Sequence, residues 1–347
     1  MTAAENSLLG FAKQALKGTP IADDAAFDYI LYTEAALGPN NVVVPLDPEV
    51  GGGALPRDLK KMGVYSGGGF EFIPRPETLG HFLAGITNTP ASEELPLATG
   101  AYKHTFTLDD PFVSPYYTVR LAPGGLWGEE LLDCRISALN LEWRAPGFVR
   151  ATAAVQGGMP AKIVTPTAGP GGSQVDGSAP FITPISTITL NGVANLKVQS
   201  GAFTAAAVIP LDEQWKVGAY APDAQDITSR AYSLTLNVKI DDASLYSKML
   251  YDPAGGEAWV AKLFREGNFE VKLATDVLVG TGTPSEQYLA IRANGQSGEA
   301  ANVVWSARQI GTRAGRQLML SVTGLFLATS HANGPITLEL VNTTPSY

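Results

Sequence analysis

Two stretches with the same cadence, residues 134–144 (CRISALNLEWR) and 229–239 (SRAYSLTLNVK), constrain the fold of this chain more than any other feature. Both are rich in regularly spaced apolar residues, and each predicts a long β-strand. When one is laid on the other, the identical pairs are Arg135 with Arg230, Leu139 with Leu234, and Leu141 with Leu236. A long strand that recurs in this way indicates two copies of one β-rich unit.

Glycine and proline are frequent, and they separate short runs of β-branched and apolar residues. The 347 residues include 37 Gly and 24 Pro. Such punctuation is typical of many strands joined by turns, and not of a helical bundle. The length suffices for two or three domains with real hydrophobic cores. We therefore expect a mainly β fold of two tandem sandwich or barrel domains, each with a packed α-helix, plus extended loops or arms.

The charge of the chain argues against nucleic-acid binding. The formal net charge is −9, and no dense run of Lys and Arg occurs, so phosphate is repelled on average. The N-terminal stretch MTAAENSLLGFAKQALKG lacks the basic and apolar regions of a secretory signal. No apolar run reaches the ~18 residues that predict a membrane span. We expect synthesis in a cytoplasm.

Local patterns predict the elements of the first half of the chain. Pro74 and Pro76 introduce an expected helix at 76–86, PETLGHFLAGI. Residues 27–36 fit a strand and a short helix equally well. The expected strands are 65–73, 100–110 and 147–157, the last returning antiparallel to 134–144 through a Pro146-Gly147 turn.

The second half begins after a compositional break. Residues 157–180 are rich in Gly, Pro, Ser and Ala, which is typical of a linker. Asn191-Gly192 predicts a hairpin, and residues 256–267, GEAWVAKLFREG, predict a second helix with an apolar stripe. The expected divisions are an N-terminal segment (1–40), a first β domain (41–160), a linker or loop (161–180) and a second β domain (181–347).

The residues that usually carry chemistry do not form a recognisable site. His81, His104 and His331 lie far apart, and Cys134 has no cysteine partner at metal-ligand spacing. A buried, inert thiol is the favoured interpretation of Cys134. His104 lies on an expected strand in which side chains alternate between the two faces. The favoured interpretation of this residue is a half-buried histidine with a backbone partner. We expect no catalytic, cofactor-binding or metal-binding residues and no cofactor.

Adjacent acidic pairs recur along the chain, for example Glu93-Glu94 and Glu129-Glu130. Neighbouring carboxylates point to opposite faces of a strand or lie together in a loop, so they make poor acid/base pairs. Sequence patterns alone would not reveal a glycosidase with a β-sandwich fold, because its carboxylates can lie far apart in sequence. A carbohydrate-active or carbohydrate-binding protein therefore stays open as an alternative.

Several stretches together resemble the tail tube proteins of long, non-contractile bacteriophage tails. The likeness covers most of residues 11–270. It includes a glycine-rich strand and PRP before a helix, and a Cys-Arg pair before a long strand and a Pro-Gly turn. The stretches that carry it are 51–86, 99–110, 128–158, 185–203 and 230–240.

The resemblance implies a structural virion protein of siphophage type with two tail-tube-type β domains. Proteins of this family form rings that stack around a tape-measure protein, and DNA later passes through the channel without specific binding. Two units in one chain predict a pseudo-sixfold ring of three chains. Assembly is expected in the host cytoplasm and no membrane is involved. Other virion ring proteins, a tail terminator or a decoration protein, stay open as alternatives.

Two features of the expected tube can be placed on the chain. Strict alternation puts Ile136, Ala138, Asn140 and Glu142 on one face of the repeated strand, with Arg135, Ser137 and Leu139 on the other. Because Asn140 and Glu142 are polar, we expect these two residues to face the lumen. The stretches expected to reach the next ring are 40–56, 86–100 and 157–180.

Overall fold

The computed structural model describes most of the chain and leaves several segments aside. The described residues are 7–21, 26–47, 55, 58–108, 114–125, 128–163, 176–190, 193–194, 197–223, 226–240, 247, 251, 258, 264–266, 269–293, 303–311, 318–328 and 334–347. Within them the chain is mainly β, as predicted, with antiparallel sheets and one α-helix. His331 and most of the expected helix at 256–267 lie outside the described residues.

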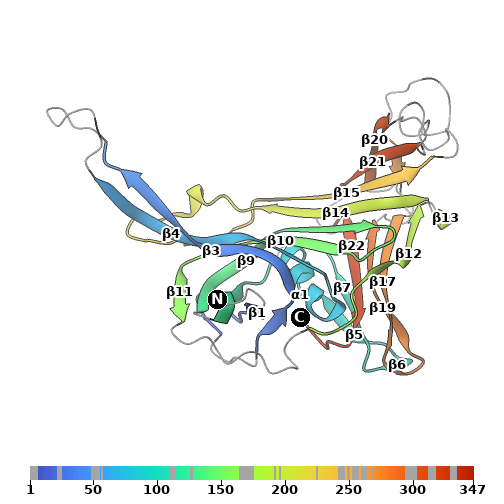
Figure 1. Cartoon of the computed structure of the whole chain (residues 1–347), viewed down its shortest axis with the longest axis horizontal. Coiled ribbons are helices and arrows are strands. Elements are labelled where there is room, and N and C mark those ends of the chain that lie inside the picture. Colours follow the sequence, from blue (N-terminus) through green and yellow to red (C-terminus); the bar gives the residue numbers. More distant parts are fainter. Residues whose placement is uncertain are drawn as a thin grey trace.

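A 13-stranded antiparallel sheet forms the larger layer (Figure 1). Its main path, in spatial order, is β16 (Phe264–Glu266), β20 (Val303–Gly311), β21 (Met319–Phe326), β15 (Ser229–Lys239), β14 (Val198–Val208), β9 (Gly128–Arg144), β10 (Arg150–Gly157), β4 (Leu59–Phe72) and β3 (Tyr32–Pro45). Off this path lie β1 (Leu8–Lys13), β2 (Asp28–Ile30), β8 (Tyr117–Ala122) and β11 (Pro160–Ile163).

A 7-stranded sheet forms the second layer, and it mixes both halves of the chain. Its order is β13 (Val193–Ala194), β12 (Ile182–Leu190), β17 (Phe269–Val279), β19 (Ser285–Ala293), β22 (Ile336–Asn342), β7 (Tyr102–Phe106) and β5 (Ala91–Glu94). A small pair joins β18 (Thr281–Gly282) to β6 (Ala98–Thr99). The hairpin expected at Asn191-Gly192 is confirmed by the pairing of Leu190 with Val193.

The helix predicted at 76–86 is confirmed as α1 (Pro76–Ile86), and it lies between the two layers. Every residue except Glu77 is buried, because β9 packs on one side of the helix and β22 on another. Its first turn is capped from the expected linker, since the Asp176 carboxylate accepts hydrogen bonds from Thr78 N (3.0 Å) and Thr78 Oγ1 (2.8 Å). A carboxylate at a helix N-terminus satisfies otherwise unpaired amides.

The faces predicted for the repeated strand need one correction. Leu139 lies on the buried face together with Ile136, while Asn140 and Glu142 lie on the opposite face. The cause is a β-bulge, because Ala138 pairs with Ala154 and Ile136 pairs with Val155, which leaves Ser137 as an extra residue. A bulge shifts the alternation of side chains by one residue, so strict alternation along 134–144 was wrong.

The two similar stretches, 134–144 and 229–239, both belong to the large sheet, as the second part of β9 and as β15. They lie on either side of β14. The spatial order β3-β4-β10-β9 is followed by β14-β15-β21-β20. In both runs, the first and second strands along the chain are followed in space by the fourth strand and then by the third. In this arrangement β9 corresponds to β20 and β15 to β4, so the two similar stretches are not counterparts in position.

The prediction of a helix at 256–267 is wrong for its C-terminal part. Residues 264–266 form β16, which pairs with Val303–Trp305 of β20. Residues 27–36, left undecided by the sequence, form β2 and the start of β3. The strands expected around 65–73, 100–110 and 147–157 are confirmed as parts of β4, β7 and β10.

Candidate functional site: the open face of the long sheet

The candidate site is the face of the large sheet that points away from α1, called here the open face. The opposite face carries the core, with Ile136, Leu139 and Leu141 of β9 fully buried. On the open face the side chains lie in rows that cross several strands, because each residue pairs with a direct neighbour on the next strand. Three consecutive rows define its chemistry.

The first row consists almost entirely of alanine. Ala36 pairs with Gly69, Gly69 with Ala154, Ala154 with Ala138, Ala138 with Ala206, and Ala206 with Ala231. Ala36, Ala206 and Ala231 are exposed and the other members of the row are partly buried. This alanine row spans six strands and presents a smooth surface without charge.

The second row is polar but uncharged at its centre. It crosses four strands as Thr152, Asn140, Thr204 and Ser233. On the β4 and β3 side the row continues to Glu71 and Glu34, which are both exposed. Thr204 Oγ1 donates to Asn140 Oδ1 (2.9 Å), and Asn140 Nδ2 donates to Glu142 Oε1 (2.7 Å). The polar groups of Asn140 are thus partly satisfied within the face, which leaves few strong sites for an outside ligand.

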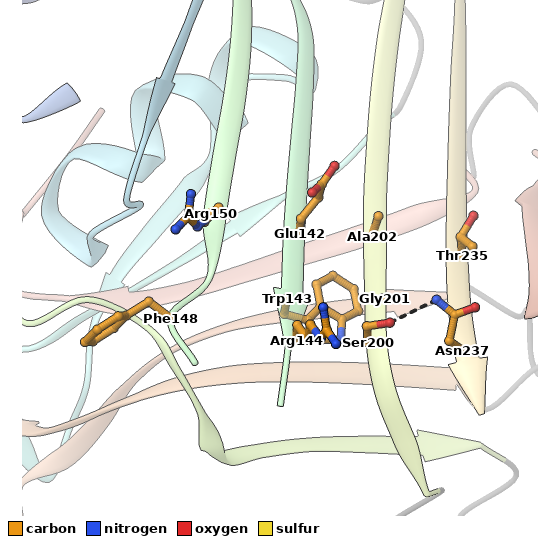
Figure 2. A pocket seen from close by; sticks show the side chains of 10 residues that line it. All are labelled: Glu142, Trp143, Arg144, Phe148, Arg150, Ser200, Gly201, Ala202, Thr235 and Asn237. Carbon is orange, nitrogen blue, oxygen red and sulfur yellow. Dashed lines mark hydrogen bonds between the residues drawn. The ribbon is translucent and has the colours of Figure 1, made fainter. Parts of the chain in front are cut away.

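The third row carries charges of both signs at one end. It runs from Arg150 through Glu142, Ala202, Thr235 and Thr323 to Ser306. Figure 2 shows residues that line a shallow hollow on this face, among them Glu142, Arg144, Phe148 and Arg150. Asn237 Nδ2 donates to Ser200 Oγ (2.9 Å) across its floor. A neighbouring hollow shares Glu142 and Arg150.

A long hairpin projects beyond the sheet (Figure 1). Beyond Ser66, β3 and β4 pair only with each other among the described strands, up to Pro45 opposite Leu59. Its apolar side chains are exposed, with Leu59 at 63%, Met62 at 53% and Val43 at 50%. An isolated two-stranded ribbon is marginally stable in water, so this arm is suited to docking against another protein surface.

The arm is held at its base by the connection between β14 and β15. Val64 N donates to Tyr220 O (2.8 Å). The Trp215 ring lies 2.4 Å from the position that a Cβ on Gly63 would occupy, so only glycine fits there without a shift. This contact could not be predicted, because Trp215 is distant from Gly63 in the sequence and belongs to no recognisable motif.

The residues singled out for chemistry have structural roles. Cys134 is fully buried, and burial raises the pKa of its thiol. His104 is also fully buried, where Ser92 Oγ lies 2.7 Å from Nδ1 and Asn342 Oδ1 lies 3.0 Å from Nε2. Burial lowers the pKa of His104, against an opposing effect of the Asn342 hydrogen bond. Side chains, and not the expected backbone group alone, therefore hold this histidine.

Several of the described acidic residues are likewise engaged in structural contacts. Glu93 forms an ion pair with Lys103, Glu94 accepts a hydrogen bond from Gly100 N, and Glu130 pairs with Arg120. No group of three or more His, Cys, Asp or Glu in the described part of the chain could hold a metal ion. The pairs at 23–24, 109–110 and 241–242 lie outside the described residues.

A sheet face with few charges at its centre, sheet edges at β3 and along β20 beyond its pairing with β16, and a projecting apolar arm define a structural protein with β-strand edges and an arm available for assembly. The comparison with protein families agrees. A model described as "Phage tail tube protein" matches residues 5–303, and the chain belongs to this family. No curated protein matches the chain.

Membership of this family confirms the resemblance drawn from the sequence and identifies a structural component of the virion tail. A structural role of this kind is non-enzymatic and does not favour the carbohydrate alternative. Among the described residues, no helix is long and apolar enough to cross a membrane.

Proposed function

We propose that the chain assembles with copies of itself into rings that stack into the tail tube of a siphophage. The tube then serves as the conduit for DNA ejection into the host. The observation that carries the proposal is the open face, whose three central rows offer mainly alanine, hydroxyl and amide groups on the strands from β10 to β15. DNA binding strength comes mainly from cationic contacts to phosphate, and such contacts are scarce on this face.

The open face is the proposed wall of the channel, with Asn140 and Glu142 facing the lumen. Both side chains lie opposite the core, on the same side of β9 as the alanine row. The charges near Glu142 include Arg150 directly across from it. Glu34 and Glu71 lie on the same face, as does Arg144. The wall in this proposal therefore carries charges of both signs at one side and few at its centre, although the chain carries −9.

Three chains are proposed to close one ring with pseudo-sixfold symmetry. The two four-stranded runs with the same order support this count, because each chain then contributes two similar sixths of the wall of one barrel. The proposed domain division, 41–160 and 181–347 on either side of 161–180, separates these two runs between β9 and β14. The segment 1–40 would add β1, β2 and most of β3 to the first unit.

The β3–β4 arm is the proposed contact between stacked rings, and it includes part of the stretch 40–56. Its exposed apolar side chains need a partner, and a heterologous contact that repeats along an axis builds a filament. The stretches 86–100 and 157–180 are less suited, because β5, β6 and β11 already pair their described parts within the chain. A tape-measure protein inside the growing tube and assembly in the host cytoplasm complete the proposal.

Negative-stain electron microscopy of the purified chain tests the proposed assembly. Hollow tubes of constant width with a regular axial repeat are the expected result after the protein is concentrated. Small globular particles under all conditions, also when tape-measure protein is supplied, would contradict it. Isolated rings that never stack would indicate a terminator-like role instead.

A further inference from the structure

We infer that the edge of β20 in one copy pairs with β3 of a second copy, in the register that β9 and β14 show inside the chain. This inference rests on the proposed tube function and names its lateral interface. The partner is a second copy of this chain, and the pairing of β9 with β14 inside the chain supplies the register.

The direction of the strands permits this junction. All neighbours along the path from β3 to β20 are antiparallel. Eight strands alternate in direction, so the first and the last run in opposite directions. A β3 strand placed beside β20 is therefore antiparallel to it, as β14 is to β9.

Two bulges fix the correspondence between β3 and β14. Near the start of β3, Tyr32 pairs with Phe72 and Glu34 with Glu71, which leaves Thr33 extra. Near the start of β14, Val198 pairs with Val238 and Ser200 with Asn237, which leaves Gln199 extra. Aligning the two bulges makes Ala36 the counterpart of Ala202, and Leu37 the counterpart of Phe203.

Burial along both strands agrees with this alignment. Tyr32 and Val198, which correspond, are both partly buried and packed against the core. Leu37 packs against the core, as its counterpart Phe203 does, while Ala36 is exposed and its counterpart Ala202 lies on the open face. The alignment therefore preserves which side chains face the core and which face the channel.

The other strands of the two four-stranded runs correspond in the same alignment. Phe72 and Phe70 of β4 correspond to Val238 and Leu236 of β15, and all four are buried. On the next strand, Ala151 pairs with Phe72 and Leu320 pairs with Val238, so β10 corresponds to β21.

The outer strands β9 and β20 then align through their own bulges. Ile136 pairs with Val155 and Leu141 with Ala151. Trp305 pairs with Gly324 and Ile310 with Leu320. Between its two pairs, each of the strands β9 and β20 contains one more residue than the strand it pairs with. Ile136 therefore corresponds to Trp305, and Leu141 corresponds to Ile310. Ile136 and Trp305 are both buried.

The internal junction now supplies the register between copies. Leu141 pairs with Phe203 and Glu142 with Ala202. The corresponding pairs between copies are Ile310 with Leu37, and Gly311 with Ala36. Within the described residues, no strand pairs with the outer side of β3.

The short strand β16 does not obstruct this junction. It pairs only with Val303, Val304 and Trp305 of β20. In the first unit, β8 pairs with β9 at Cys134 and before it, while β14 pairs with β9 from Ala138 onward. The residues of β20 after Trp305 thus correspond to the part of β9 that pairs with β14.

Cysteine cross-linking across Ala36 and Gly311 tests the register. The native Cys134 is fully buried, so it contributes no background. Directly opposed side chains in a sheet have Cβ atoms about 5 Å apart, within reach of a short bismaleimide. In assembled protein, the double variant Ala36→Cys plus Gly311→Cys should shift from monomer to covalent dimer and trimer. A closed ring of three chains gives no larger species.

Matched controls separate this register from others. Glu142→Cys plus Ala202→Cys occupies the corresponding positions inside one chain and should cross-link without forming dimers. Mixing chains that carry only Ala36→Cys with chains that carry only Gly311→Cys should give heterodimers. Cross-linking of Ala36→Cys with itself would show β3 paired with β3 and would overturn the inference.

A second measurement does not depend on substitutions. Hydrogen exchange of the unmodified chain should show residues 34–38 and 306–311 protected on assembly, with little change in β14. Tubes that form without this protection and without the cross-link would overturn the register while leaving the tube function in place. The absence of any assembly would instead overturn the proposed function.

Discussion

Tyr347 fills a space in the core that a glycine of α1 leaves open. Its ring lies 2.1 Å from the position that a Cβ on Gly80 would occupy, and it packs edge-on against His81 and His104. In a helix interior, alanine is favoured over glycine by about 1 kcal/mol, whereas overpacking a core costs about 1–3 kcal/mol. We expect Gly80→Ala to lower the free energy of unfolding, as measured by denaturant titration.

The sign of this effect should reverse when the ring is removed. In a Tyr347→Ala background, helix propensity alone remains, so Gly80→Ala should be neutral or stabilising. Equal destabilisation in both backgrounds would show that the contact with Tyr347 does not limit position 80.

His104 gives the fold a dependence on pH. Burial holds the pKa of His104 below its ordinary value of 6.5, so the folded state keeps the ring neutral while the unfolded state takes up a proton near pH 6.5. Stability is therefore complete above this pH and falls as the pH drops through 6.5 toward the lowered pKa. Thermal unfolding of the wild type and of His104→Gln between pH 7.5 and 5.5 should show a smaller loss in the variant. Parallel pH profiles would contradict this assignment.

At the scale of elements, the β3–β4 arm is the clearest case of a segment built for assembly. Replacing residues 41–62 by a short glycine-containing turn removes its exposed apolar part and keeps Val64, whose amide binds Tyr220 O. We expect the melting temperature to change little, because the arm adds few contacts to the core, and we expect stacking to fail. Tubes with an unchanged axial repeat would show that another element joins the rings.

The elements show what the sequence could predict and what it could not. Local signals sufficed for α1, for the β7 and β10 strands, and for the β12–β13 hairpin, because caps, alternation and turn residues are neighbours in sequence. The bulge at Ser137 was not predictable, since it depends on pairing with β10. The true counterparts β9 and β20 share little sequence, and the similarity between 134–144 and 229–239 reflects a common alternation of apolar residues.

The candidate site was predictable only in part. Asn140 and Glu142, the two residues expected in the lumen, share the open face. The alanine row was not foreseen, because its six residues come from six different strands. Whether this face lines a channel remains a prediction of the proposed assembly.

At the scale of the whole molecule, the alanine row should control how freely DNA passes. Ala206→Lys places a cation on this row, and a cation binds phosphate in a salt-dependent manner. Phage particles with this variant should eject DNA more slowly at low salt and recover as salt is raised. Ala206→Gln, of similar length without charge, should eject normally. Equal rates for both variants would place Ala206 away from the DNA path.

The most direct test of the central claim is a cryo-electron microscopy reconstruction of the assembled tube. We predict rings of three chains with pseudo-sixfold symmetry, a continuous barrel of strands, and Asn140, Glu142 and the alanine row facing the channel. A tube whose channel is lined by another surface, with the open face sealed against a neighbour, would contradict the account.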